Sequence, residues 1–197
     1  MAGYLSDREF TDHVHLHHAL PKIYSKIGWQ LIDVAKDQAL HQDLNEGIDY
    51  TFKNADGKII TVQERFREKK YAQFSDATLR FRRANHPNEN RIESEFYKIK
   101  ADYLVYGVMD GDKNNIASIN GFIKGVILNI PFLQEKYKIG ELLIGSTGTV
   151  RCQRKGNTMI CPEILNKDGS SSFLPFDICM IKSLWTSGAV LHQKGYY

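Results

Sequence analysis

One acid and a short polar run in this chain could together carry metal-dependent chemistry. Asp49 lies in the segment GIDYTF, and Gln63-Glu64-Arg65 lies in the next predicted strand, beyond the turn sequence KNADGK. Carboxylate oxygens are the ligands that Mg²⁺ prefers, and a guanidinium holds a phosphate while keeping its charge. An acid beside such bases indicates a surface on which an anion could lie.

Period-two alternation sorts three predicted strands, residues 47–52, 59–68 and 76–83, into two faces. Ile60, Val62 and Phe66 share an apolar face, which also carries Glu64 unless a bulge intervenes. The polar face carries one acid and five bases: Asp49, Lys53, Arg65, Arg67, Arg80 and Arg82. A solvated sheet face would explain such a pattern. Neighbouring arginines repel one another, however, unless an anion lies across them.

This arrangement resembles the PD-(D/E)XK nuclease superfamily, which includes many restriction endonucleases. The shared pattern is an acid on one strand, a hairpin, an acidic or amide residue two before a cation, and then strand, helix and strand. The resemblance runs from about Trp29 to Val108. It implies that Asp49 is the first metal-binding acid, that Gln63 or Glu64 is the second, and that Arg65 replaces the family's lysine. Ile48 stands where the family often has proline.

The resemblance implies a metal-dependent endonuclease that cuts double-stranded DNA with Mg²⁺ or Mn²⁺, of the restriction or phage-defence kind. Asp49 and Glu64 would bind the metal. Glu64 is preferred to Gln63 because a carboxylate is the better Mg²⁺ ligand and because bulges re-aim side chains beside active sites. Without a bulge, Gln63 takes that place. The bases expected on the nucleic acid are Arg67, Arg80, Arg82, Lys53, Lys69 and Lys70.

Arg65 cannot accept a proton from the attacking water, so the metal alone, or Lys53, Lys69 or Lys70, would have to provide the hydroxide. Cutting both strands with one site per chain favours a homodimer. Two alternatives remain open. The chain could be a nucleic-acid-binding module without catalysis, or an inhibitor or assembly subunit whose arginines pair with a protein's acids.

Length and composition favour one globular domain over residues 1–197. The net charge is only +3, so binding to an anionic polymer would depend on local clustering of bases. Without an apolar run of about 18 residues or a signal peptide, a cytoplasmic protein with no membrane partner is expected. Three cysteines without a CxxC spacing argue against disulfides and zinc knuckles. Gly145–Gly148 lacks the spacing and lysine of a phosphate loop, so no nucleotide cofactor is expected.

The flanking sequence predicts elements that would position this site. A capping box at Ser6–Glu9 predicts a helix start, and Pro21 predicts a second short helix that stops at Gly28. The segment DHVHLHH between them is interpreted as a partly exposed helix without a metal. Asn54–Gly57 predicts a hairpin turn.

Beyond the third predicted strand, a loop over residues 84–91 and a helix over residues 91–100 are expected. The apolar run from Ala101 to Val108 predicts a buried strand, paired in parallel through the helical crossover. From Asp110 the sequence predicts helix at the two ends of residues 117–137, then short strands in a β-rich C-terminal part. The predicted fold class is a mixed α/β (α+β) sheet with flanking helices.

Overall fold

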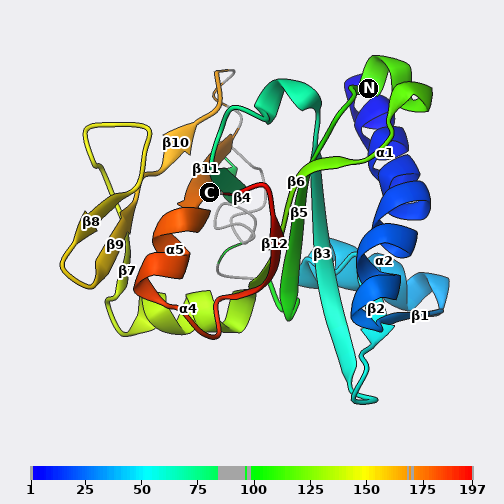
Figure 1. Ribbon diagram of the computed structural model, residues 1–197, viewed down its shortest axis with the longest axis horizontal. Helices are drawn as coiled ribbons and strands as arrows, with labels where there is room; N and C mark the ends of the chain where they lie inside the picture. Colours follow the sequence, from blue (N-terminus) through cyan, green and yellow to red (C-terminus); the bar gives the residue numbers. More distant parts are fainter. Residues whose placement is uncertain (1, 84–95, 97–98, 168, 170, 197) are drawn as a thin grey trace.

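The computed structural model describes residues 2–83, 96, 99–167, 169 and 171–196, and its centre is a mixed six-stranded sheet (Figure 1). The strand order is β1 (Gln30–Ile32), β2 (Tyr50–Lys53), β3 (Ile59–Arg67), β5 (Tyr103–Met109), β6 (Phe122–Asn129) and β12 (Val190–Lys194). All neighbours pair antiparallel except β3 and β5, which are parallel. The predicted mixed α/β fold and the predicted parallel pairing of the strand at residues 101–108 are therefore confirmed.

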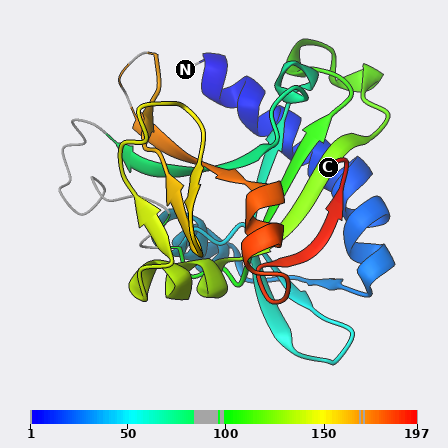
Figure 2. The same cartoon turned by 60° about the vertical axis from the view of Figure 1, so that its left-hand side comes forward.

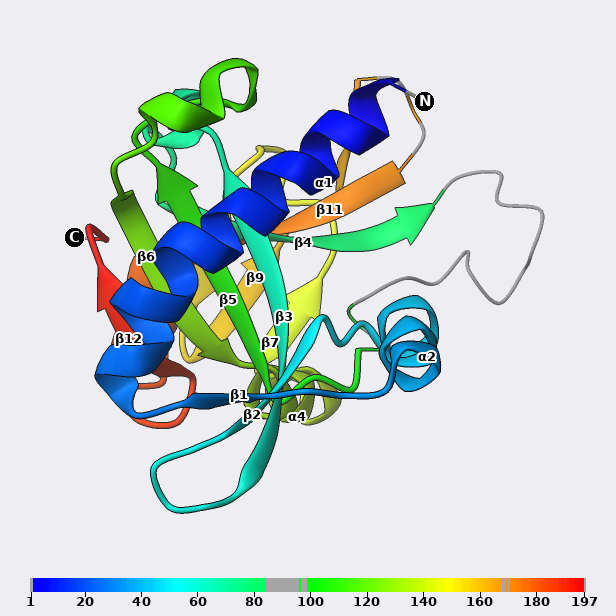
Figure 3. The same ribbon diagram turned by 90° about the vertical axis from the view of Figure 1, so that its right-hand side faces the viewer.

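A long N-terminal helical run covers one face of this sheet and crosses it diagonally (Figure 3). It consists of α1 (Ala2–Val14), a π-helical segment η1 (His15–Tyr24) and a 3₁₀ turn η2 (Ser25–Ile27), and it ends at Gly28 with φ +74°. The predicted helix start at Ser6 and the predicted start of a separate helix at Pro21 are both wrong, and the predicted stop at Gly28 is confirmed. Pro21 has no N–H to donate to an α-helical carbonyl, and here it lies inside the widened π segment.

The other face is covered by two small sheets and two helices, drawn mostly in yellow and orange in Figure 2. One small sheet has the order β10 (Ile164–Leu165), β11 (Ser171–Asp177), β4 (Asp76–Arg83). The other has the order β7 (Leu142–Ile144), β9 (Thr158–Cys161), β8 (Gln153–Lys155). The helices are α4 (Ile130–Lys138) and α5 (Ile178–Leu184). The prediction of a β-rich C-terminal part is confirmed.

Strand β4 corrects the predicted three-stranded polar face. It leaves the central sheet and pairs antiparallel with β11, from Asp76 opposite Asp177 to Arg83 opposite Ser171. The third strand of the antiparallel meander is instead β1, which flanks β2 on its other side. Ala77, Leu79 and Phe81 are buried in the core between the layers. Alternation thus identified a strand but could not tell which sheet it joins.

Helix α2 (Lys36–Glu46) lies beside the edge of the central sheet and was not predicted as a helix. None of its residues is buried, so the sequence gives no strong apolar stripe to reveal it. Two 3₁₀ turns, η3 (Lys69–Tyr71) and η5 (Lys113–Ser118), follow β3 and β5.

The hairpin turn at Asn54–Gly57 is confirmed, because the Gly57 N–H donates to the Asn54 carbonyl at 3.0 Å. The loop predicted over residues 84–91 and most of the helix predicted over 91–100 lie outside the described residues. Phe96 is helical and buried.

Two hydrophobic clusters sit on the two faces of the central sheet. Phe52, Val62 and Phe66 pack beneath the N-terminal helical run, and Leu104 and Tyr106 pack toward β4, β11, α4 and α5. Each fully buried apolar side chain contributes roughly 1.5–3 kcal/mol, so both layers are anchored to the sheet. Within the described part of the chain, no helix has the length and apolarity needed to cross a lipid bilayer.

Candidate functional site

The site forms where β2 ends and the edge of β3 becomes accessible. Pairing between the two strands runs from Lys53 opposite Ile59 to Tyr50 opposite Val62 and goes no further. Beyond it, the Asp49 N–H donates to the Val62 carbonyl at 2.8 Å. The Asp49 carboxylate then accepts the main-chain N–H of Glu64 at 2.6 Å. The Asp49 carboxylate thus accepts a main-chain N–H of β3 beyond the last residue pair of β2 and β3. This hydrogen bond fixes the carboxylate beside Gln63.

A groove of about 930 Å³ lies along this edge and is here called the β3 groove. Figure 3 shows β3 with α1 crossing in front of it, and with β4 and α2 both on the right-hand side of β3, β4 above and α2 below. Gln63, Arg65 and Arg67 line it from β3, Asp49 lines it from the residue before β2, and Arg80 lines it from β4. The lining from the flanking elements includes Asp7, Arg8, Thr11 and Asp12 from α1, Lys36, Ala39, Leu40, Asp43 and Leu44 from α2, and Glu68, Lys70, Tyr71 and Lys113.

The fold brings most of the predicted site residues together, and it separates three of the predicted bases. Asp49, Gln63, Glu64, Arg65, Arg67, Lys70 and Arg80 all line the β3 groove. Lys53 is exposed at the far end of the β2–β3 hairpin, and Lys69 is exposed on η3. Arg82 pairs with Glu163 at 3.4 Å, beside a different depression near residues 144–150. Those three side chains lie outside the groove.

The preference for Glu64 as the second metal ligand is corrected by the geometry of β3. This strand pairs with β2 and β5 without a register shift, so the bulge that would turn Glu64 toward Asp49 is not there. The Glu64 side chain is 0% exposed, although the whole residue is 8% exposed. What Glu64 presents to the groove is therefore its main chain, and Gln63 is the residue whose side chain lies on Asp49's side.

The Glu64 carboxylate is held on the opposite face by two partners from the N-terminal helical run. His15 Nδ1 donates to its two oxygens at 2.9 and 3.0 Å, and the Tyr24 hydroxyl donates at 2.5 Å. Burial, together with the charge of Glu64, raises the pKa of Tyr24 well above its usual value, so the hydroxyl keeps its proton. The His15 ring also stacks on Tyr50, with ring centroids 3.7 Å apart.

The hydrogen bonds from His15 and Tyr24 explain how a charged Glu64 can occupy an apolar strand position. A buried carboxylate without partners costs several kcal/mol, and hydrogen bonds from His15 and Tyr24 offset that cost. The histidine-rich segment was interpreted as structurally incidental, which is wrong for His15. An acid at an apolar strand position was the signal that a buried donor had to exist. Nothing in the spacing identified His15 and Tyr24 as those donors, because they lie 49 and 40 residues away from Glu64 in sequence.

Guanidinium groups make the groove electropositive close to Asp49. Arg65, Arg67 and Arg80 are half-buried, which strengthens their fields relative to fully exposed charges. Arg67 donates to the Thr78 hydroxyl at 3.3 Å and lies over the Tyr71 ring at 4.9 Å. Its Nε is buried without a hydrogen-bond partner among the described residues. An anion with several acceptor oxygens would suit this surface.

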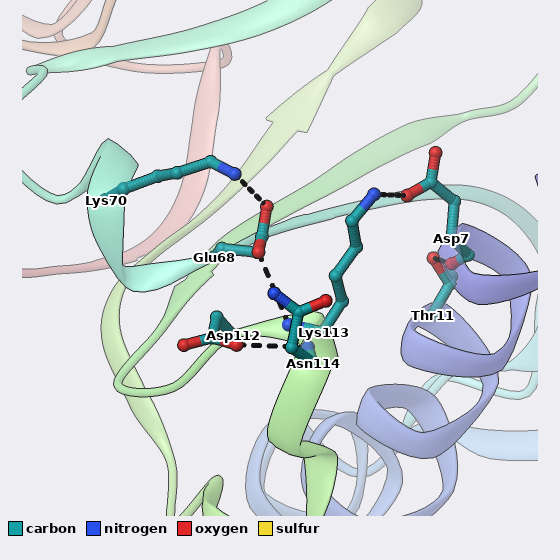
Figure 4. A network of polar contacts seen from close by, with 7 residues as sticks. All are labelled: Asp7, Thr11, Glu68, Lys70, Asp112, Lys113 and Asn114. Atoms are coloured by element: carbon teal, nitrogen blue, oxygen red, sulfur yellow. Dashed lines mark hydrogen bonds and ion pairs between the residues drawn. The ribbon is translucent and has the colours of Figure 1, made fainter. Parts of the chain in front are cut away.

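Ion pairs join α1 to η3 and η5 at one part of the groove lining (Figure 4). Lys70 pairs with Glu68 at 2.6 Å, Glu68 accepts the Lys113 main-chain N–H at 3.3 Å, and Lys113 pairs with Asp7 at 2.6 Å. The hydrogen bond from Glu68 raises the pKa of Lys70 above its usual value. Lys70 therefore stays protonated, and it is not set up to remove a proton from water.

The oxygen ligands near Asp49 are few, and they suit only a metal that shares its coordination with substrate. Among the residues that the structure describes, no group of three His, Cys, Asp or Glu side chains could hold a metal ion. Mg²⁺ often keeps several waters and uses one or two carboxylates plus phosphate oxygens. Gln63 Oε1 is buried and lacks a hydrogen-bond partner within the described part of the chain. Asp49 and Gln63 therefore fit a Mg²⁺ ion that arrives with a phosphate.

Comparison of the chain with models of protein families, with curated proteins and with solved structures found no match. The function is therefore argued from the β3 groove and its residues.

Proposed function

We propose that this chain is a metal-dependent endonuclease of the PD-(D/E)XK kind, which hydrolyses phosphodiester bonds of DNA in the β3 groove. The observation that carries the proposal is the hydrogen bond that fixes Asp49 beside Gln63, with Arg65 two residues further along β3. The topology supports it through the β2–β3 hairpin and the later strand β5, which pairs parallel to β3, whereas the strand between them, β4, belongs to another sheet.

In this proposal two side chains bind the metal ion and three arginines bind the phosphates. Asp49 and Gln63 would hold Mg²⁺ or Mn²⁺, which supplies a nucleophile by lowering the pKa of a bound water. Arg65 stabilises the charge that develops on the scissile phosphate and never has to titrate. Arg67 and Arg80 hold the neighbouring phosphates and keep the backbone in register with Asp49.

A second candidate is a nucleic-acid-binding module of the same fold without catalysis. Two observations favour it: the Glu64 carboxylate is bound to His15 and Tyr24 on the other face, and an arginine stands at the family's lysine position. This candidate keeps the arginine-lined groove as a phosphate-binding surface and assigns no metal to Asp49.

A supercoiled-plasmid assay with and without Mg²⁺, run beside a gel-shift assay, separates the two. Metal-dependent nicking supports the endonuclease, and a shift without cutting supports the binding module. The absence of both cutting and a shift, with single-stranded DNA as well as with duplex DNA, contradicts both and leaves the interaction subunit.

Cutting of both strands of a duplex in a restriction or phage-defence role would require two sites. We propose a homodimer for that reason. Sedimentation of the protein alone and with DNA tests it, and a monomer under both conditions would rule it out.

A further inference from the structure

An apolar wall stands on one side of the β3 groove. Leu40 and Leu44 lie four residues apart on α2, so they share a helical face, and both line the groove. They are 59% and 53% exposed. Two exposed leucines on one face of a helix that lines a groove form a small apolar patch, which suits an apolar surface of a ligand in that groove.

The other side of the same groove is cationic. Arg65 and Arg67 belong to β3, and Arg80 belongs to β4. Asp49 comes after α2 and before β3 in the sequence. The groove therefore has two leucines among polar side chains on its α2 side and three arginines toward β3 and β4. A ligand that matches both must carry an anionic chain and apolar faces side by side.

A single nucleic-acid strand has this chemistry, and a duplex does not. Unpaired bases expose their flat apolar faces next to the phosphates, and single-strand sites combine a basic groove with aromatic side chains on which the bases stack. In the β3 groove Leu40 and Leu44 would take that place by aliphatic contact with the bases. In a duplex the base faces are stacked on one another, so a protein can contact only the phosphates, the sugars and the base edges. The arginines alone would serve a duplex, but Leu40 and Leu44 would then have no role.

The size of the groove agrees with a short stretch of one strand. Its volume of about 930 Å³ lies near the upper end of sites that enclose small ligands, about 300–1,000 Å³. Residues of α1 and the ion pairs Lys113–Asp7 and Lys70–Glu68 are part of its lining. A specific duplex interface is larger and flatter, and buries about 1,000–2,500 Å² of protein surface.

We propose that the β3 groove takes an unpaired DNA strand, with its bases against Leu40 and Leu44 and its phosphates on Arg65, Arg67 and Arg80. The inference rests on the proposed nuclease function and specifies its substrate: the scissile bond lies in a single-stranded segment, such as a frayed end or a branch of a duplex.

The test measures binding in EDTA, so that it does not depend on cleavage. Fluorescence anisotropy compares a labelled single-stranded 12-mer with a blunt duplex of the same sequence. The variants are Leu40→Ala, Leu44→Ala and their combination. Leu16→Ala and Leu191→Ala are matched controls, because these leucines are 57% and 53% exposed and do not line the groove.

The parent should bind the single strand about tenfold or more tightly than the duplex, and the double variant should lose roughly tenfold of single-strand affinity. The controls should bind as the parent does, and thermal unfolding should show all variants folded. Duplex binding as tight as single-strand binding, or leucine variants no weaker than the controls, overturns the inference.

The nuclease proposal fails separately. If the single strand binds through Leu40 and Leu44 but is never cut with Mg²⁺, the groove assignment stands and hydrolysis is wrong. If a duplex is cut and the leucines have no effect, hydrolysis stands and the single-strand inference is wrong. Binding of neither DNA overturns both.

Discussion

The carboxylate of Asp49 and the main-chain N–H of Glu64 are joined by a hydrogen bond of 2.6 Å across the point where β2 and β3 part. The side chain of the same glutamate is held on the opposite face by His15 and Tyr24. Glu64 thus connects the N-terminal helical run to the groove residue Asp49 through one strand position. Its structural role and the role of Gln63 should therefore separate in experiments.

Glu64→Gln should lower stability and leave the metal requirement of cleavage unchanged. In the amide, Oε1 can still accept from His15 and Tyr24, but the second oxygen, which accepts from His15 at 3.0 Å, becomes an NH₂ group that meets the same donor. This costs about 1–3 kcal/mol. Urea unfolding measures the loss, and cleavage across a Mg²⁺ titration measures the requirement. A variant that folds as stably as the parent but needs more Mg²⁺ would return Glu64 to the metal site.

Gln63→Ala should behave in the opposite way. Its side chain lies on Asp49's side of β3, and its Oε1 has no hydrogen-bond partner among the described residues, so removal should change the unfolding free energy by less than about 0.5 kcal/mol. The Mg²⁺ concentration for half-maximal cleavage should rise. An unchanged Mg²⁺ titration would show that Gln63 is not a ligand.

Arg67→Ala and Arg80→Ala should each weaken DNA binding for all sequences alike and reduce the salt slope by about one unit. Arg82→Ala is the matched control, because Arg82 lies on the same strand as Arg80 but pairs with Glu163 outside the groove. Binding titrations at several salt concentrations give the slopes. Equal effects of all three substitutions would mean that DNA is not confined to the β3 groove.

Asp76→Asn should stabilise the fold at neutral pH. Burial, and then the charge of Asp177 opposite it, raise the pKa of the Asp76 carboxyl above its usual value. The folded state therefore holds this proton to higher pH than the unfolded chain does, and stability falls as the pH rises from the unfolded pKa through the folded one.

The gain from Asp76→Asn should be largest above both pKa values and should shrink as the pH falls toward the unfolded one. Urea unfolding at pH 7 and at acidic pH tests this. A gain that grows in acid would contradict it.

The sequence was most informative about features that depend on a single strand, such as which of its side chains are buried. Alternation along residues 59–67 placed Gln63, Arg65 and Arg67 on one side and Ile60, Val62 and Phe66 on the other, as the burial of β3 has it. The turn at Gly57 and the parallel pairing of β5 followed from local chemistry and from the crossover rule.

What escaped prediction depends on contacts between distant segments. Pairing of β4 with β11 joins residues 76–83 to residues 171–177, and no local pattern encodes that choice. His15 and Tyr24 reach Glu64 only because the N-terminal helical run lies across the sheet. Helix α2 carries Leu40 and Leu44 on an exposed face. Its apolar residues therefore did not form the pattern of a buried helix or of a strand, and the helix was not predicted.

The central claim is tested most directly by the rate at which Asp49→Ala cleaves DNA at saturating Mg²⁺. Asp43→Ala is the control, because Asp43 is an exposed acid that lines the same groove from α2. The proposal predicts that Asp49→Ala loses cleavage by on the order of 100-fold or more, keeps DNA binding in EDTA, and differs from Asp43→Ala, which cuts as the parent does. Cleavage by Asp49→Ala at the parent's rate would contradict the assignment of the site.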